Sequence, residues 1–261
     1  MRVLITNDDG WQSEGIRALA GAIAGHGHDA IVVAPTSDRS GASASVGPLH
    51  RAGAIPFEEH TWPELPDVRV LAIDAPPATA VYASLLGGFG EPPDVVASGV
   101  NPGGNTGHLV LHSGTVGAAL SAAALGVPAV AASVSWNPDG RHRFETAAEL
   151  AAVALDWVTV PDDEPRVLNI NAPDRPAREV RGVREASLAP YGEFWVADAD
   201  TSTGDLKIEF KGHDHEPRPE SDLALLRAGF AAVTPLSGID RARIAGAADA
   251  IAARWQGGAT P

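Results

Sequence analysis

Short apolar runs alternate with segments of helical periodicity along most of the chain. The runs are rich in β-branched residues, which is typical of strands buried on both faces of a parallel sheet. They occupy residues 3–5, 30–34, 68–73, 95–96, 128–134, 167–170 and 230–234. Apolar residues three and four positions apart predict helices at about 14–25, 78–86, 116–125, 144–157 and 240–255. This alternation predicts an α/β fold with a doubly wound, mostly parallel, Rossmann-like sheet.

From about residue 178 the pattern changes to alternating apolar and polar positions. Segments 180–183, 193–197 and 206–210 alternate in this way, and turn residues separate the last two. The pattern predicts a C-terminal β-hairpin arm at about 180–212 within a single domain spanning 1–261. Because an isolated hairpin is marginally stable in water, we expect the arm to build a homodimer, which a second pairing could extend to a tetramer. The alternative is that the hairpin folds back over its own sheet.

Composition narrows the classes of protein that this sequence can encode. A net charge of −14 argues against binding duplex nucleic acid. The chain has no cysteine, which excludes disulfides, a thiol nucleophile and thiolate metal sites. It has neither a basic leader nor a long apolar span, so a cytoplasmic protein without a membrane partner is expected. The only lysines are Lys207 and Lys211, and no P-loop motif is present.

Three polar clusters, at residues 7–10, 36–43 and 98–107, each follow a predicted strand directly. The carboxyl ends of parallel strands are the usual ligand site of such sheets. The adjacent carboxylates of Asp8 and Asp9 repel each other unless a cation lies between them, and oxygen ligands suit Mg²⁺, Mn²⁺ or Ca²⁺. A solvated turn is the alternative for this pair alone. The three clusters together favour a metal-and-phosphate site.

A fourth segment precedes the predicted helix at 116–125. Ser113 is a suitable N-cap, and the free N–H groups of a first helical turn can bind an anion. A plain helix cap explains the same residues. His112 could donate a hydrogen bond to a substrate oxygen or pack at the mouth of the loop.

These motifs, in this order, resemble those of the SurE family, and the resemblance extends to about residue 250. The matching segments are Asn7-Asp8-Asp9-Gly10, Arg39-Ser40-Gly41-Ala42-Ser43, residues 98–107 and Ser113-Gly114-Thr115. The resemblance implies a divalent-metal-dependent phosphatase that hydrolyses nucleoside 5′-monophosphates, with 3′-monophosphates as a further class. It also implies a homodimer or tetramer whose subunits exchange C-terminal elements.

The resemblance also assigns roles to individual residues. One Mg²⁺ or Mn²⁺ ion per subunit is expected, at a site that Ca²⁺ could occupy, and Asp8 or Asp9 would take the proton from water. The implied metal ligands are Asp8, Asp9, Ser40 and Asn101. The implied substrate and phosphate ligands are Asn7, Arg39, Asn105, His112, Ser113, Gly114 and Thr115.

The sequence departs from the family pattern at three positions. Thr79 stands where the family usually has an aspartate, Ala80 replaces a cysteine, and His112 replaces an aromatic residue. Two alternatives to a nucleotidase therefore remain. One is a phosphatase dedicated to a phosphorylated biosynthetic intermediate, and the other is a nucleotide-binding sensor without catalytic activity.

Overall fold

The computed structural model describes residues 1–47, 53–162, 166–192, 194–202, 204–212 and 216–237. The terminal helix expected at 240–255 lies outside these residues. Within them, no helix has the length and apolar character needed to cross a membrane.

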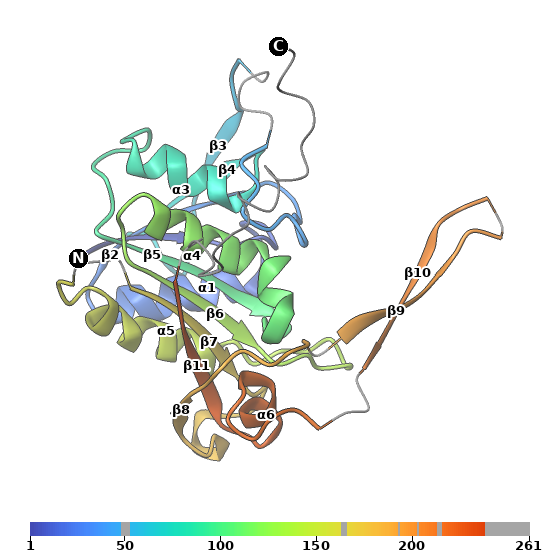
Figure 1. Cartoon of the computed structure of the whole chain (residues 1–261). Coiled ribbons are helices and arrows are strands. Elements are labelled where there is room, and N and C mark those ends of the chain that lie inside the picture. The colour runs from blue at the N-terminus through green and yellow to red at the C-terminus, as the bar shows by residue number, and fades with distance from the viewer. Residues whose placement is uncertain (48–52, 163–165, 193, 203, 213–215, 238–261) are drawn as a thin grey trace, which may run out of the picture.

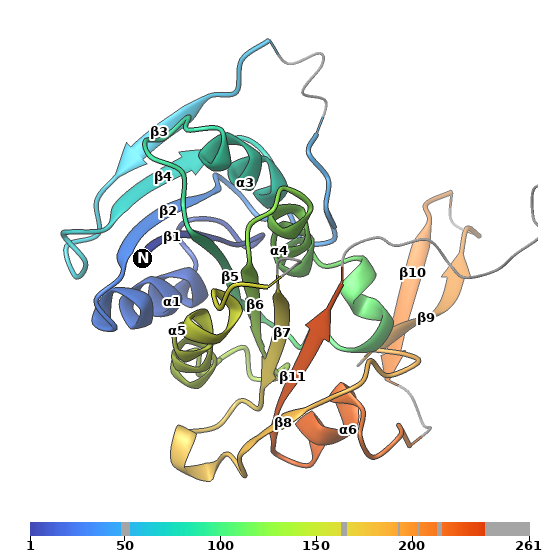
Figure 2. The same ribbon diagram turned by 60° about the vertical axis from the view of Figure 1, so that its left-hand side comes forward.

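A nine-stranded sheet in the order β3-β4-β2-β1-β5-β6-β7-β11-β8 forms the centre of the molecule (Figures 1 and 2). Strands β4, β2, β1, β5, β6 and β7 are parallel, whereas β3 is antiparallel to β4 and β11 is antiparallel to β7. The strand order reverses between β1 and β5, which is where ligands bind in doubly wound sheets. The strands are β1 (Arg2–Thr6), β2 (Asp29–Pro35), β3 (Phe57–His60), β4 (Arg69–Ile73), β5 (Val95–Pro102), β6 (Ala129–Val134), β7 (Val167–Ala172), β8 (Val183–Glu185) and β11 (Ala231–Leu236).

Helices cover both faces of the sheet (Figures 1 and 2). On one face, α1 (Glu14–Gly25) and α5 (Glu145–Val158) pack over Val3 and Ile5 of β1. On the other face, α3 (Pro77–Leu85) and α4 (Gly114–Ala124) pack over Leu4. Successive side chains of a strand point to opposite faces, so one apolar run contributes to two cores. The predicted doubly wound, mostly parallel α/β fold is confirmed.

The hairpin begins later than the sequence pattern indicated. Strands β9 (Phe194–Asp200) and β10 (Lys207–Gly212) pair antiparallel in a separate two-stranded sheet that projects from the body of the molecule (Figure 1). Strand β8 does not join them, because it pairs in parallel with β11 at the edge of the main sheet. An exposed edge strand and a hairpin strand show the same alternation, so the pattern could not separate the two.

Three short helices were not predicted from the sequence. They are α6 (Asp222–Arg227) and the 3₁₀ helices η1 (Gly107–Leu111) and η2 (Ala177–Glu179). None of them is long enough to display a helical repeat of apolar residues. Nevertheless, η1 and α6 both lie beside the polar loops at the carboxyl edge of the sheet.

Candidate active site

Asp8 connects three of the predicted polar segments through its side chain and its main-chain carbonyl. It is 3% exposed at the end of β1. Its Oδ1 accepts a hydrogen bond of 2.5 Å from the Thr115 hydroxyl, and its Oδ2 accepts one of 3.1 Å from the Gly114 N–H. The main-chain carbonyl of Asp8 accepts a third hydrogen bond, of 2.7 Å, from the Arg39 N–H. The clusters at 7–10, 36–43 and 113–115 therefore meet at this one residue.

The start of α4 is shaped to receive this carboxylate. A side-chain carbon at position 114 would lie 2.7 Å from Asp8 Oδ2, so glycine is required for the close approach. Ser113 caps the helix, because its hydroxyl oxygen accepts a hydrogen bond from the Val116 N–H. Asp8 itself thus occupies the positive end of the helix dipole. A further contact of Gly114 and Thr115 with phosphate stays a prediction.

Asp9 is the unsatisfied member of the pair. Its Oδ2 is buried and has no hydrogen-bond partner among the described residues. The pKa of Asp9 is raised to about 8, chiefly by burial and additionally by the negative charges of Asp8 and Asp38. Burial also raises the pKa of Asp8, although its hydrogen bonds to Thr115 and Gly114 act in the opposite direction. Two neighbouring carboxylates, one buried and one partly buried with a free buried oxygen, fit a divalent cation, because the cation would stabilise both in the charged form.

Ser40 and Asn101 can complete the ligand set. The Ser40 hydroxyl donates to Asp38 Oδ1 at 2.6 Å, which leaves the oxygen lone pairs of Ser40 available. The Asn101 amide nitrogen donates to the Gly103 carbonyl at 2.6 Å, which orients Oδ1 as the remaining acceptor. In the part of the chain that the structure describes, no three His, Cys, Asp or Glu side chains gather into a metal site. The predicted set therefore depends on hydroxyl and amide oxygens beside the two carboxylates.

Strand pairing brings Asn101 and the aspartates to the same edge of the sheet. The register of β1 and β5 ends with Thr6 opposite Ser98, and Asp9 and Asn101 each lie three residues beyond that pair. Asp38, which follows β2 on the other side of β1, was not singled out from the sequence. Its position two residues before Ser40 was the available signal.

Asn7 acts within its own turn. Its amide nitrogen donates to the Gly10 carbonyl at 3.1 Å and to the Ser13 hydroxyl at 2.8 Å, and its Oδ1 accepts from the Gly10 N–H at 3.2 Å. Ser13 in turn caps α1 by accepting from the Ile16 N–H. The side chain thereby fixes the turn that carries both aspartates, and its predicted contact with substrate stays a prediction.

Arg39, Thr79 and His112 all contribute to the surrounding loops. The Arg39 guanidinium donates to Asp74 Oδ1 at 2.6 Å. The buried Thr79 hydroxyl donates to the Val46 carbonyl at 3.0 Å, so this departure from the family pattern serves to anchor the loop after β2. His112 has an exposed side chain, and its carbonyl accepts from the Ser43 N–H. Phosphate contacts by Arg39 and His112 remain predictions.

Asn105 is held by two residues that sequence reasoning missed. Its amide nitrogen donates to the Ser133 hydroxyl at 2.9 Å. The main-chain carbonyl of Asn105 accepts hydrogen bonds from the side-chain amide nitrogens of Asn169, at 2.8 Å, and Asn171, at 3.2 Å. These two asparagines lie two positions apart on β7 and so share a face. Two polar residues in an otherwise apolar buried strand were the signal that could have identified them.

Asp222 is another residue that the sequence did not identify. It is fully buried at the start of α6, where Oδ2 accepts from the Gly107 N–H at 2.8 Å and Oδ1 accepts from the N–H groups of Ala189 and Leu223. Burial raises the pKa of Asp222, and these hydrogen bonds partly counteract the effect. Asp222 thereby fastens the end of the 98–107 loop. No sequence pattern distinguished it from a surface carboxylate.

A sequence model of the family described as Survival protein SurE matches residues 3–192. The chain belongs to the SurE family.

Several relatives are similar to this SurE chain over nearly its whole length. A protein named 5′-nucleotidase SurE from Stenotrophomonas maltophilia (strain R551-3) is 36% identical, covering 90% of this chain and 89% of the relative. A protein of the same name from Xanthomonas campestris pv. campestris (strain B100) is 34% identical, covering 100% and 97%. The crystal structure of a SurE protein from Aquifex aeolicus aligns with a TM-score of 0.73 at 26% identity, covering 93% of this chain and 95% of that one. The resemblance stated from the motifs is therefore confirmed.

Replacing Thr115 tests its hydrogen bond to Asp8. Thr115→Val removes the hydroxyl without changing the shape of this fully buried side chain, so Asp8 Oδ1 loses its donor. We expect a loss of about 1–3 kcal/mol in the free energy of unfolding, measured by urea denaturation. The matched Thr115→Ser variant keeps the hydroxyl and should lose less than about 1 kcal/mol. Equal losses in the two variants would contradict the role of the hydroxyl.

The pKa of Asp9 predicts how metal-free protein responds to pH. Its folded-state pKa of about 8 lies above the ordinary value of 3.8, so folding favours the protonated form. The metal-free protein should therefore lose stability as pH rises from about 4 to 8, by several kcal/mol, since each pKa unit of difference corresponds to about 1.4 kcal/mol. Asp9→Asn cannot ionise and should reduce this decline, leaving the part that comes from Asp8 and Asp222, whose pKa values burial also raises, whereas exposed Asp29→Asn should retain the whole of it. Thermal unfolding in chelator across this pH range provides the measurement, and an unchanged decline in Asp9→Asn would refute the assignment.

Proposed function

We propose that this protein is a phosphomonoesterase that hydrolyses nucleoside 5′-monophosphates with a bound divalent metal ion. The observation that carries the proposal is the buried, unpartnered Asp9 Oδ2 beside the fixed carboxylate of Asp8. The names of the relatives, 5′-nucleotidase SurE, support the substrate class. Nucleoside 3′-monophosphates are a further proposed class of substrate.

The proposed metal ligands are Asp8, Asp9, Ser40 and Asn101, with Mg²⁺ or Mn²⁺ as the working ion and Ca²⁺ able to occupy the site. When bound, the ion would polarise the phosphoryl group and acidify a water molecule. Asp8 serves chiefly to bind and orient, because both of its oxygens already accept hydrogen bonds. Asp9 has the free oxygen and is the better candidate to accept the proton of the attacking water.

Two alternative functions would use the same site. A phosphatase dedicated to a biosynthetic intermediate would retain the metal ligands and differ in what surrounds the leaving group, where the exposed His112 replaces an aromatic residue. A nucleotide sensor would bind without hydrolysis. A panel of nucleotides and sugar phosphates distinguishes the first alternative from a nucleotidase, and a generic phosphate ester with Mn²⁺ distinguishes the second.

Activity should depend strictly on metal and on Asp8. Chelator-treated protein should be inactive toward nucleoside 5′-monophosphates and should recover when Mg²⁺ or Mn²⁺ is added. Asp8→Asn should lower kcat more than about 100-fold, which corresponds to about 2.7 kcal/mol of activation free energy. Asp29 is the first residue of β2 and lies at the amino ends of the strands, away from the candidate site, so Asp29→Asn should leave kcat unchanged. Full activity in chelator would refute metal dependence, and full activity of Asp8→Asn would refute the role of Asp8.

We also propose that the β9–β10 hairpin is a dimerisation arm. The hairpin forms a sheet of its own that projects from the body, and Leu206 and Ile208 are exposed by 64% and 48% (Figure 1). Exposed apolar surface of this kind favours an interface between subunits. Light scattering should give a dimer or tetramer for the intact chain and a monomer when residues 194–212 are replaced by a short Gly/Ser turn. A monomeric intact chain at micromolar concentration would contradict the proposal.

A further inference from the structure

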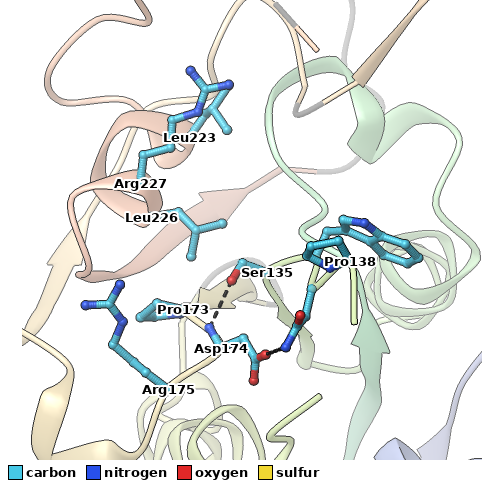
Figure 3. A pocket seen from close by; sticks show the side chains of 10 residues that line it. Ser135, Pro138, Pro173, Asp174, Arg175, Leu223, Leu226 and Arg227 are labelled. Carbon is cyan, nitrogen blue, oxygen red and sulfur yellow. Dashed lines mark hydrogen bonds between the residues drawn. The ribbon is translucent and has the colours of Figure 1, made fainter. Parts of the chain in front are cut away.

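A cavity of about 290 Å³ opens at the carboxyl ends of β6 and β7, beneath α6. Ser135 and Trp136 follow β6, Arg175 follows β7, and Leu226 and Arg227 come from α6. Figure 3 shows Leu226 directed from α6 toward Ser135 and Pro173, with Arg175 and Arg227 on one side. No residue of the predicted metal or phosphate set lines this cavity.

The loop of the candidate active site forms the boundary of this cavity. A side-chain carbon at Gly103 would lie 3.9 Å from the Trp136 ring, and one at Gly104 would lie 3.2 Å from Leu226 Cδ2. The loop that carries Asn101 and Asn105 therefore contacts two walls of the cavity. The candidate metal site lies at the carboxyl ends of β1 and β5, and the cavity lies at those of β6 and β7. The centres of these two strand pairs are two strand spacings apart, which is about 10 Å. That distance suits a substrate with a leaving group much larger than its phosphate.

The lining combines apolar surface with hydrogen-bond donors. The Trp136 side chain is 48% exposed, and Leu226 also lines the cavity. In the described part of the chain, neither Arg175 nor Arg227 forms an ion pair, although the protein carries a net charge of −14. Asp174, by contrast, is fully engaged, because its carboxylate accepts from the Asn137 amide at 2.6 Å and the Arg143 N–H at 2.7 Å. The polar groups left for a ligand are therefore mainly donors.

We propose that this cavity, the leaving-group pocket, binds the base of a nucleoside monophosphate, with Trp136 as the stacking surface. A planar ring suits the exposed indole, and the carbonyl oxygens and ring nitrogens of a base are acceptors for the two guanidinium groups. Stacking tolerates different bases, because every base has a π face. This inference rests on the proposed function and adds to it the residues that recognise the nucleoside.

A purely structural role for Trp136 predicts a different result. Its ring makes an edge contact with His142, at 5.6 Å between centroids, so it contributes to packing of the loop after β6. If packing were its only role, its loss would affect all phosphate esters equally. If it binds the base, its loss affects only substrates that carry a base.

The test compares Trp136→Ala, Trp136→Phe and the matched control Trp157→Ala. Trp157 is 50% exposed and lies near the end of α5, where it packs against Arg166. Arg166 directly precedes β7, so Trp157 lies at the amino ends of the strands, away from the cavity. The kinetic substrates are guanosine 5′-monophosphate and glycerol phosphate, which has no ring. Binding of guanosine is measured by calorimetry in chelator, so that the readout requires neither metal nor hydrolysis.

We expect Trp136→Ala to weaken guanosine binding and to raise KM for guanosine 5′-monophosphate by about tenfold, with kcat nearly unchanged. Its kinetics with glycerol phosphate should match those of the wild type, Trp136→Phe should restore most of the binding, and Trp157→Ala should have no effect. Equal effects on both esters, or guanosine binding unaffected by Trp136→Ala, would overturn the inference. Trp136-dependent guanosine binding in a protein that hydrolyses no phosphate ester would support the pocket while refuting the proposed function.

Discussion

The carboxylate of Asp8, buried against the first turn of α4, is the interaction on which the rest of the candidate site depends. It brings the end of β1 to the start of α4 and, through the Asp8 carbonyl, also fixes the loop after β2. A buried charge is tolerated only when hydrogen bonds or a counter-ion compensate it. Both carboxylate oxygens of Asp8 accept hydrogen bonds, whereas Asp9 Oδ2 has no partner among the described residues, so the two adjacent aspartates differ in chemistry although they are the same residue type.

Much of the fold could be predicted because buried strands and amphipathic helices have simple repeats. The run at β1 and the spacing of Ile16, Leu19 and Ile23 in α1 identified both elements nearly to their ends. β8 was misassigned because three residues cannot show whether their partner is a hairpin or a sheet edge. α6 was missed because six residues give less than two turns of helical repeat.

The candidate site was predictable where residue type alone limits the chemistry, as with Asp8 and Asp9. The supporting contacts were not predictable, because they join residues that are far apart in sequence. Asn169 and Asn171 hold the main-chain carbonyl of Asn105 across more than sixty positions, and only the strand order β5-β6-β7 brings them together. Thr79 departs from the family pattern, and only its hydrogen bond to the Val46 carbonyl shows what it does in this chain.

The hydrogen bond from Gly107 to Asp222 has a consequence for the order in which the protein is made. The two residues are 115 positions apart, and Asp222 follows every strand of the parallel core. During synthesis the parallel sheet can therefore assemble while the 98–107 loop is still unfastened. A chain that terminates before residue 222 would retain both aspartates and Asn101 but would lack the carboxylate that anchors this loop. This anchor of the loop can therefore form only after synthesis has passed residue 222.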